Sequence, residues 1–207
     1  MANKFTLSAL AGASIGLAGF VNLAIGGVPG AVLFSFGLLS VYAYGLSLFT
    51  GKAGRFEPDS KGFKDLLFIL LGNIFGAAVV AMLTRISPLD LPQAAGKILA
   101  SRLNLGWWKA GLLAIACGWI VEEAVASARA GVMAPTYFGV ALFVLCGFPH
   151  SIADAFYYAA APLDMLCANW AGILGVYGAI VLGNFIGCNL RRILGIPEEV
   201  RFHFRKS

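Results

Sequence analysis

The stretch Cys146-Gly147-Phe148-Pro149-His150-Ser151-Ile152-Ala153-Asp154 interrupts a long apolar segment of the sequence. Pro149 removes a backbone donor and clashes with the preceding turn, so a helix through this stretch should break there. His150 and Asp154 are ionisable, and placing such residues within an apolar membrane segment is costly. Irregular backbone at membrane depth is tolerated only where protein buries it or water lines it. We therefore expect a functional site at this break.

The composition supports a membrane location for the chain. Of its 207 residues, 59% are hydrophobic and only 12% are charged, and the mean hydropathy is +0.84. A soluble globular domain carries about 25% charged residues, and intrinsic disorder requires low hydrophobicity and high charge. Both classes are therefore excluded. The net charge of +5 comes without a compact basic stretch interleaved with aromatic residues, so no nucleic-acid partner is expected.

Six apolar stretches approach the roughly 20 residues that a membrane-spanning helix needs. They run approximately Phe5–Gly27, Pro29–Phe49, Leu66–Leu83, Trp107–Ala128, Pro135–Ala161 and Ala168–Leu190. Most of the 15 Lys and Arg residues lie on the side of the N-terminus, which predicts that both termini are cytoplasmic. The predicted organisation is one multi-pass channel domain, 1–207, with a short cytoplasmic N-terminus, 1–4, and a cytoplasmic tail, 191–207.

A repeated hexapeptide indicates that the chain is built from two related halves. Leu71-Gly72-Asn73-Ile74-Phe75-Gly76 in the third stretch resembles Leu182-Gly183-Asn184-Phe185-Ile186-Gly187 in the sixth, with coincidence as the alternative. Three spans per half is an odd number, so matched halves must face opposite ways. The second stretch also ends in glycines and polar residues, over 45–54. The predicted fold is an all-α membrane protein of six transmembrane helices in an inverted 3+3 repeat, with the second and fifth helices broken.

The sequence offers little support for a metal or a cofactor. His150 and Asp154 lie four residues apart and present two ligands, but no third His lies in the spans. The four cysteines form no C-x-x-C pair, and no phosphate-binding loop motif is present. We therefore predict no metal, no cofactor and no enzymatic activity. The alternative for His150 is a neutral imidazole whose hydrogen bonds are met by a neighbouring hydroxyl or carbonyl.

Two motifs resemble those of the formate/nitrite transporter family. Gly147-Phe148-x-His150-Ser151-Ile152-Ala153 is similar to its fifth-helix signature, and Leu48-Phe49-Thr50-Gly51 is similar to its second-helix loop motif. The Gly-Asn-x-x-Gly elements also fit, and Cys117-Gly118-Trp119-Ile120-Val121 fits less completely. The resemblance extends from about Leu10 to Leu194. It implies an aquaporin-like protomer with its own pore, assembled as a homopentamer in a bacterial-type inner (plasma) membrane.

The resemblance also implies roles for individual residues. Thr50 and His150 match the family's central pair, which face each other in the pore, and Asn184 matches a polar residue near that pair. Arg102 matches a lysine that would attract anions at the outer mouth, with help from Lys97 and Lys109. The outer hydrophobic constriction would comprise Phe34, Leu38 and Phe143, and the inner one Leu48, Phe49 and Val121. Without the family, helix packing would be the better interpretation of the two outer phenylalanines.

Four positions depart from the family pattern. Arg102 keeps the charge of the family's lysine but fixes it permanently. Gly118 stands where the family has a pore-side asparagine, so a hydrogen-bonding group is absent. Pro149 replaces the acidic residue that commonly precedes the histidine, and Asp154 replaces an asparagine four residues beyond it. We expect these departures to affect selectivity and, with it, the transport mechanism.

These features predict a channel or transporter for small monovalent weak-acid anions such as formate, nitrite or hydrosulfide. A bare anion loses its hydration in an apolar constriction at a large cost. Because imidazole titrates near physiological pH, His150 could pass a proton to the anion, so that the neutral acid crosses. One alternative is an aquaporin-type channel for neutral solutes, although the chain lacks paired Asn-Pro-Ala motifs. The other is a membrane-embedded redox enzyme subunit in which His150 and Asp154 perform acid–base chemistry. A haem ligand pair would need a second histidine, and His203, the other histidine of the sequence, lies in the basic tail.

Overall fold

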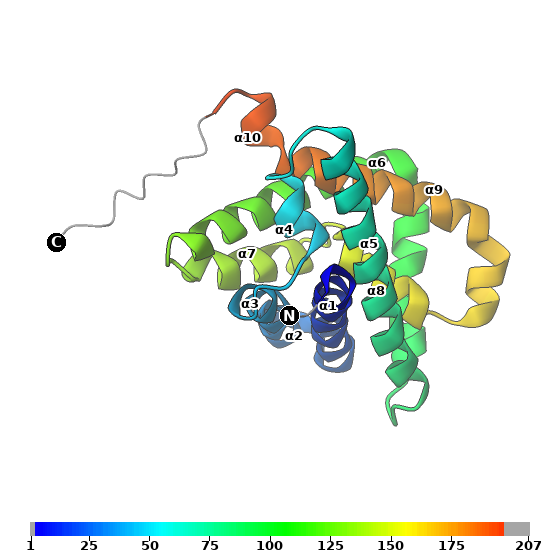
Figure 1. The fold of residues 1–207 in the computed structure, drawn as a ribbon. Coiled ribbons are helices and arrows are strands. Elements are labelled where there is room, and N and C mark those ends of the chain that lie inside the picture. The colour runs from blue at the N-terminus through cyan, green and yellow to red at the C-terminus, as the bar shows by residue number, and fades with distance from the viewer. Residues whose placement is uncertain (1–2, 197–207) are drawn as a thin grey trace.

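The structure, a computed structural model, describes residues 3–196 of the chain. Every regular element in this range is a helix (Figure 1). Four helical segments are long and apolar enough to cross a membrane, judged by length and composition: Lys4–Ile25, Ser60–Arg85, Leu91–Arg129 and Leu163–Cys188. Two shorter apolar segments are Gly27–Ala43 and Ala134–Leu145. Most of the predicted cytoplasmic tail, including His203, lies outside the described residues.

The helices follow one another with short connections. In chain order they are α1 (Lys4–Ile25), α2 (Gly27–Leu33), α3 (Ser35–Ala43), α4 (Phe49–Ala53), α5 (Ser60–Ala81), the 3₁₀ turn η1 (Met82–Arg85), α6 (Leu91–Arg129), α7 (Ala134–Leu145), α8 (Ser151–Ala160), α9 (Leu163–Cys188) and α10 (Leu190–Ile193).

Several helices begin earlier than the apolar stretches that predicted them. The side chain of Asp59 caps the start of α5 by accepting the N–H of Gly62 at 2.6 Å, so this helix begins six residues before the predicted Leu66. The largest difference is in α6, which begins at Leu91 and bends at Gly106, where φ is 71°. Hydropathy alone missed its first part because charged residues lower the apolar signal there. Lys97 and Arg102 therefore lie within this helix, before the predicted span Trp107–Ala128.

The two interrupted segments end in the same way. Gly45 follows α3 with a φ of 61°, and Gly147 follows α7 with a φ of 66°. One residue later, the N–H of Leu46 donates to the carbonyl of Val41, and that of Phe148 donates to the carbonyl of Phe143, both at 2.9 Å. These are Schellman-type helix ends, which need a left-handed residue and so favour glycine. Helix α7 thus ends before Pro149 is reached, and the glycine, not the proline as predicted, terminates it.

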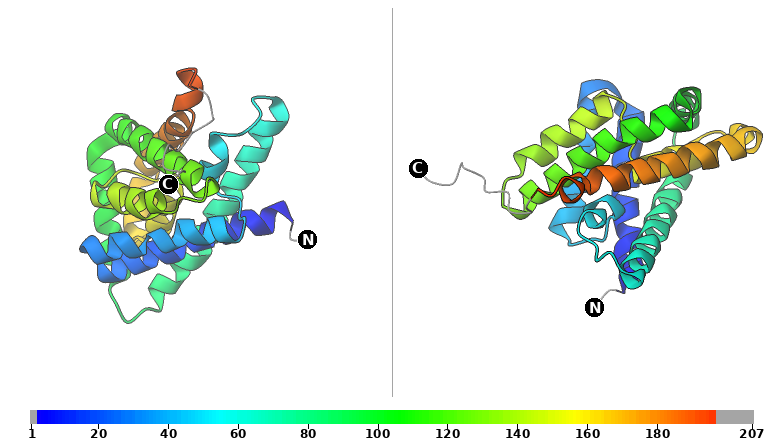
Figure 2. Two further views of the ribbon diagram at one scale, coloured as in Figure 1. Left: turned by 90° about the vertical axis from the view of Figure 1, so that its left-hand side faces the viewer. Right: turned by 90° about the horizontal axis from the view of Figure 1, so that it is seen from above.

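The long helices pair through glycines that let two backbones touch. Helices α1 and α5 lie side by side, as do α6 and α9 (Figures 1 and 2). A Cβ atom at Gly76 of α5 would overlap the carbonyl oxygen of Ala9, and one at Gly187 of α9 would overlap that of Ile115. Such close approach is what small residues provide in membranes, where the hydrophobic effect does not bring helices together.

The distribution of polarity is that of a protein with an apolar exterior and a polar centre. Large apolar side chains such as Phe36, Leu71 and Trp170 are more than half exposed on the outside. Polar residues are fully buried at the starts of the short helices or against them: Thr50, Asn73, Ser151, Asp154 and Asn184. Since burying a polar group without a partner is costly, the hydrogen bonds of these residues define the site.

Gly187 provides a test of the close helix contact. Its replacement by Ala should force α6 and α9 apart, and such overpacking costs about 1–3 kcal/mol. We expect a lower melting temperature in detergent, followed by circular dichroism. Gly175→Ala is the matched control on the same helix, because its Cβ atom would meet open space. Equal melting temperatures for the two variants would contradict the proposed contact.

Candidate functional site

The starts of the two short helices meet at a threonine–histidine contact. Thr50 lies in the first turn of α4, and His150 is the N-cap residue of α8. Thr50 Oγ1 and His150 Nε2 are 3.1 Å apart, and both residues are buried. The N–H of Ala153 donates to His150 Nδ1 at 3.3 Å. Because Nδ1 acts as an acceptor, the neutral tautomer that satisfies both contacts carries its proton on Nε2 and donates it to Thr50.

Asn184 holds the start of α8 in place. Its Oδ1 accepts the N–H of Ser151 at 2.7 Å, while its Nδ2 donates to the carbonyls of Ala114 at 2.8 Å and Pro149 at 3.0 Å. These groups belong to the first residue of α8, to the segment before it and to α6. The amide of Asn184 is therefore engaged with backbone, and its predicted role near the substrate stays a prediction.

Asn73 makes the corresponding contacts at the start of α4. Its Oδ1 accepts the N–H of Phe49 at 2.7 Å, and its Nδ2 donates to the carbonyls of Ser8 at 2.7 Å and Ser47 at 2.8 Å. Each buried asparagine thus satisfies one backbone N–H and one backbone carbonyl at the start of a short helix, and it also donates to a carbonyl of a neighbouring long helix. In the sequence, Asn73 is marked only by the repeated Gly-Asn-x-x-Gly motif. That motif was the signal for its role in holding the start of α4.

An ion pair fixes the turn that carries His150. Arg102 Nε donates to Asp154 Oδ1 at 2.8 Å, and Arg102 Nη1 donates to the carbonyl of Gly147 at 2.9 Å. The other carboxylate oxygen of Asp154 accepts the N–H of His150 at 2.9 Å. The side chains of Arg102 and Asp154 are 10% and 1% exposed, so the pair is buried. We refer to these three contacts as the Arg102–Asp154 clamp.

The predicted role of Arg102 is to attract anions at the outer mouth. The structure places its guanidinium beside the carboxylate of Asp154, which balances the charge. Asp154 departs from the family pattern, and its pairing with Arg102 leaves no signal in the sequence, because α6 and α8 are distant along the chain. The attraction of anions by Arg102 stays a prediction.

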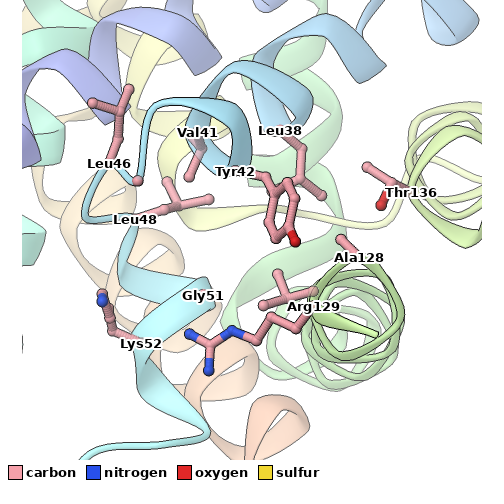
Figure 3. A pocket seen from close by; sticks show the side chains of 12 residues that line it. Leu38, Val41, Tyr42, Leu46, Leu48, Gly51, Lys52, Ala128, Arg129 and Thr136 are labelled. Carbon is pink, nitrogen blue, oxygen red and sulfur yellow. The ribbon is translucent and has the colours of Figure 1, made fainter. Parts of the chain in front are cut away.

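Three cavities lie in a row along the protomer. The aromatic cavity, of about 60 Å³, is lined by residues that include Phe34, Phe143, Phe148, His150 and Tyr157. The central cavity, of about 10 Å³, shares three of these, namely Phe34, Phe143 and His150. The basic vestibule, of about 230 Å³, shares Leu38 and Leu48 with the central cavity (Figure 3). The shared side chains mark the boundaries between neighbouring cavities.

Apolar side chains separate the cavities on both sides of His150. The rings of Phe34 and Phe143 meet edge to face with centroids 5.9 Å apart, and Phe143 stacks on the His150 ring at 5.5 Å. Leu38, predicted in the outer constriction, lines the central cavity together with Phe34 and Phe143, and with Leu48 it also lines the vestibule. Their roles in constricting a pore stay predictions.

The other two predicted members of the inner constriction occupy different surroundings. Val121 lines the central cavity. Phe49 is buried, and its backbone N–H is held by Asn73, but it is not among the residues that line the three cavities. The structure thus brings Val121 next to His150 and places Phe49 outside the row of cavities.

Gly118 has a packing function that the sequence did not reveal. A Cβ atom at this position would overlap the carbonyl oxygen of Asn184, and one at Gly12 would overlap that of Asn73. The asparagine that the resemblance places here would therefore collide with α9. Hydropathy and motif spacing carry no information on such an approach between helices.

The structure also identifies cavity-lining polar residues that sequence analysis missed. Asn22 lines the aromatic cavity and donates to the hydroxyl of Tyr157 at 3.0 Å. A lone asparagine in an apolar helix was the available signal for it. Lys52 and Arg129, assigned only to topology, line the basic vestibule. Within residues 3–196, no group of three or more His, Cys, Asp or Glu side chains is arranged to hold a metal ion.

Comparison with solved structures places this fold among known channels. A structure described as a pentameric formate channel with formate bound has a TM-score of 0.77 at 22% identity, covering 93% of this chain and 94% of that one. A structure described as an FNT family ion channel has a TM-score of 0.79 at 22% identity, with coverages of 92% and 87%. These similarities show the fold.

Sequence comparison provides the family. A curated relative described as "Uncharacterized transporter YrhG", from Bacillus subtilis (strain 168), is 28% identical over 178 residues. The match covers 76% of this chain and 66% of the relative, so the chain spans just under two thirds of that relative's length. Residues 1–191 match the family described as Formate/nitrite transporter. Together with the apolar helices, this match identifies an integral membrane protein. Because the match covers nearly the whole chain, the chain belongs to the formate/nitrite transporter family.

Proposed function

We propose that the protein conducts small monovalent weak-acid anions, such as formate, nitrite or hydrosulfide, and that His150 exchanges a proton with them. The observation that carries this proposal is the position of the Thr50–His150 contact. The imidazole lines both the aromatic and the central cavity, and apolar side chains close the central cavity on both sides. A titratable group at this place can protonate an anion in the aromatic cavity, before the apolar boundaries that a hydrated ion does not cross.

The protomer is proposed to be a six-span inverted 3+3 repeat, with its second and fifth spans broken before α4 and α8. Matched hydrogen bonds support this proposal, because Asn73 and Asn184 hold the two helix starts through the same three kinds of contact. The glycine-terminated helix ends before them match as well. An inverted repeat places the substrate site near the midplane, where the two halves meet.

The proposed assembly and orientation follow the family. One structurally similar protein is described as a pentameric formate channel, and we propose a homopentamer with one pore in each protomer. The single channel domain, 1–207, would lie in a bacterial-type inner membrane with both termini cytoplasmic. In this orientation the basic vestibule opens to the cytoplasm, and the aromatic cavity opens to the outside.

The proposed mechanism moves one proton with each anion. His150 takes up a proton to become an imidazolium, transfers a proton to an anion in the aromatic cavity, which it also lines, and returns to its neutral form. The resulting neutral acid crosses the apolar boundaries, formed by Phe34 and Phe143 and by Leu38 and Leu48, without the Born cost of a bare ion. The hydroxyl of Thr50 would orient the substrate beside the imidazole.

The Arg102–Asp154 clamp is proposed to position His150. It holds the carbonyl of Gly147 and the N–H of His150, which lie at the two ends of the turn. The two charges offset each other, so the wall of the aromatic cavity gains rigidity with little net charge. Removing either partner alone would leave the other charge buried without its counter-ion.

The clamp can be tested by a double-mutant cycle in detergent. Asp154→Asn and Arg102→Met should each destabilise the protein by about 3–5 kcal/mol, whereas the double variant should lose less than the sum. Thermal unfolding followed by circular dichroism provides the comparison. Asp65→Asn is the control, since the ion pair of Asp65 with Lys4 is about half exposed and should contribute at most about 1 kcal/mol. Additive losses in the cycle would argue against the clamp.

The proton-exchange role can be tested in proteoliposomes. Radiolabelled formate flux through the wild type should rise as the pH falls, because protonation assists passage. His150→Phe should abolish this flux or its pH dependence, and Thr50→Val should reduce it. Cys167→Ser, at an exposed position on α9, is the control and should behave as the wild type.

A substrate panel extends the same assay to nitrite, hydrosulfide, acetate and lactate across pH. The apolar boundaries should favour the smallest acids. If His150→Phe conducted formate at the wild-type rate at every pH, the proton-exchange role would be wrong.

A further inference from the structure

Most polar groups on the wall of the aromatic cavity already have partners in the protein. The four polar side chains that line this cavity are Asn22, His150, Asp154 and Tyr157. The two ring nitrogens of His150 face the hydroxyl of Thr50 and the N–H of Ala153. The two carboxylate oxygens of Asp154 accept from Arg102 and from the N–H of His150. A ligand in this cavity therefore finds a free hydrogen-bond donor only on the remaining two side chains.

These two side chains form a hydrogen-bonded pair, which we call the Asn22–Tyr157 pair. Asn22 of α1 donates from Nδ2 to the hydroxyl oxygen of Tyr157 on α8 at 3.0 Å. The other end of the amide, Oδ1, lies against Gly30 of α2, where an added Cβ atom would come within 3.1 Å of it. Tyr157 is 5% exposed. The tyrosine hydroxyl is thus held at the cavity wall with its oxygen toward α1.

The direction of this bond leaves the phenolic proton available. A tyrosine hydroxyl carries one proton to donate, in addition to the lone pairs that accept. Since Asn22 donates to the oxygen, the proton of Tyr157 points away from Asn22, and no acceptor for it is found among residues 3–196. A buried donor without an acceptor is costly. A ligand that accepts this proton is therefore favoured in the cavity.

The size and polarity of the cavity suit a small anion with an accepting oxygen. The cavity volume of about 60 Å³ is several times the roughly 10–15 Å³ that one water molecule needs, so an ion of a few non-hydrogen atoms fits. The remaining lining residues are apolar: Phe34, Ile98, Phe143, Val144, Phe148 and Ala153. In such surroundings a hydrogen bond is stronger than in water. Oxygen is also a better acceptor than sulfur.

We propose that the Tyr157 hydroxyl, oriented by Asn22, binds an oxygen of the substrate in the aromatic cavity and selects oxyanions such as formate and nitrite over hydrosulfide. This inference rests on the proposed function and deepens it. The hydrogen bond holds the anion in the cavity that His150 lines. Hydrogen bonds to a charged acceptor are about twice as strong as those to a neutral one. Once His150 has given the anion a proton, the neutral acid is held less tightly and moves on.

Direct binding tests the pair independently of transport. Sodium formate is titrated into the purified full-length protein in detergent at neutral pH, and saturation-transfer NMR follows the formate proton. We expect saturable binding to the wild type. Tyr157→Phe removes only the hydroxyl and should weaken formate affinity by about tenfold, because hydrogen bonds to charged groups are strong.

Tyr158→Phe is the matched control for this titration. Tyr158 is the next residue of α8 and is also buried, and its hydroxyl has no hydrogen-bond partner within residues 3–196. It does not line the aromatic cavity. Its loss of a hydroxyl should leave formate affinity at the wild-type value.

Two results of the titration would overturn the proposal: no saturable binding to the wild type, or equal affinities for the wild type and Tyr157→Phe. Circular dichroism of each variant checks folding. Asn22→Leu is a second variant, which lets the tyrosine hydroxyl turn away from the cavity and should weaken formate binding as well. If Tyr157→Phe does not fold, an Asn22→Leu affinity equal to that of the wild type overturns the pair.

Flux measurements in proteoliposomes test the selection of oxygen over sulfur. The ratio of formate flux to hydrosulfide flux at one pH should fall by about tenfold in Tyr157→Phe and stay unchanged in Tyr158→Phe. A purely structural role of Tyr157 would lower both fluxes by the same factor, and that result overturns the selectivity. If the wild type binds formate through Tyr157 but carries no weak-acid flux, the proposed function fails and the pair stands. If both fluxes proceed with an unchanged ratio in Tyr157→Phe, the pair fails alone.

Discussion

The structure depends on one constraint: a helix that breaks inside an apolar bundle must find partners for its open backbone groups. Water does not solvate such groups in the hydrocarbon region of a membrane, and each unsatisfied one costs several kcal/mol. Asn73 and Asn184 meet this requirement with one neutral amide each, which accepts one N–H and donates to one carbonyl at the interruption. The same amide also donates to a carbonyl of a neighbouring long helix, that of Ser8 or of Ala114. Since both amides are fixed by neighbouring long helices, α4 and α8 begin at defined places, and Thr50 and His150 are brought within 3.1 Å of each other.

The sequence predicted the elements that leave a hydropathy or motif signal. The positions of the two interruptions followed from glycines and polar residues within apolar runs, and the repeated Gly-Asn motif marked the two asparagines that hold them. The first part of α6 was missed because Lys97 and Arg102 depress its hydropathy. The cause of the break after α7 was misassigned to Pro149, although a left-handed Gly147 ends the helix first.

Contacts between residues that are distant along the chain could not be predicted from the sequence, for a physical reason. Hydropathy and spacing describe one helix at a time, whereas Arg102 and Asp154 lie on different helices and meet only in the folded bundle. The same holds for Gly118, whose missing side chain makes room for the Asn184 carbonyl across a helix contact. The contact between Thr50 and His150 was anticipated through the family resemblance, which carries three-dimensional information that composition and periodicity lack.

The Arg102–Asp154 clamp has a consequence for how this sequence can diverge. An isolated change at either position passes through a protein with a buried unpaired charge, which is strongly disfavoured. We therefore expect the two positions to change together, because a relative that abandons the ion pair has to replace both residues. An arginine at position 102 paired with an aspartate at position 154 is then a mark by which relatives with the same electrostatic arrangement can be recognised.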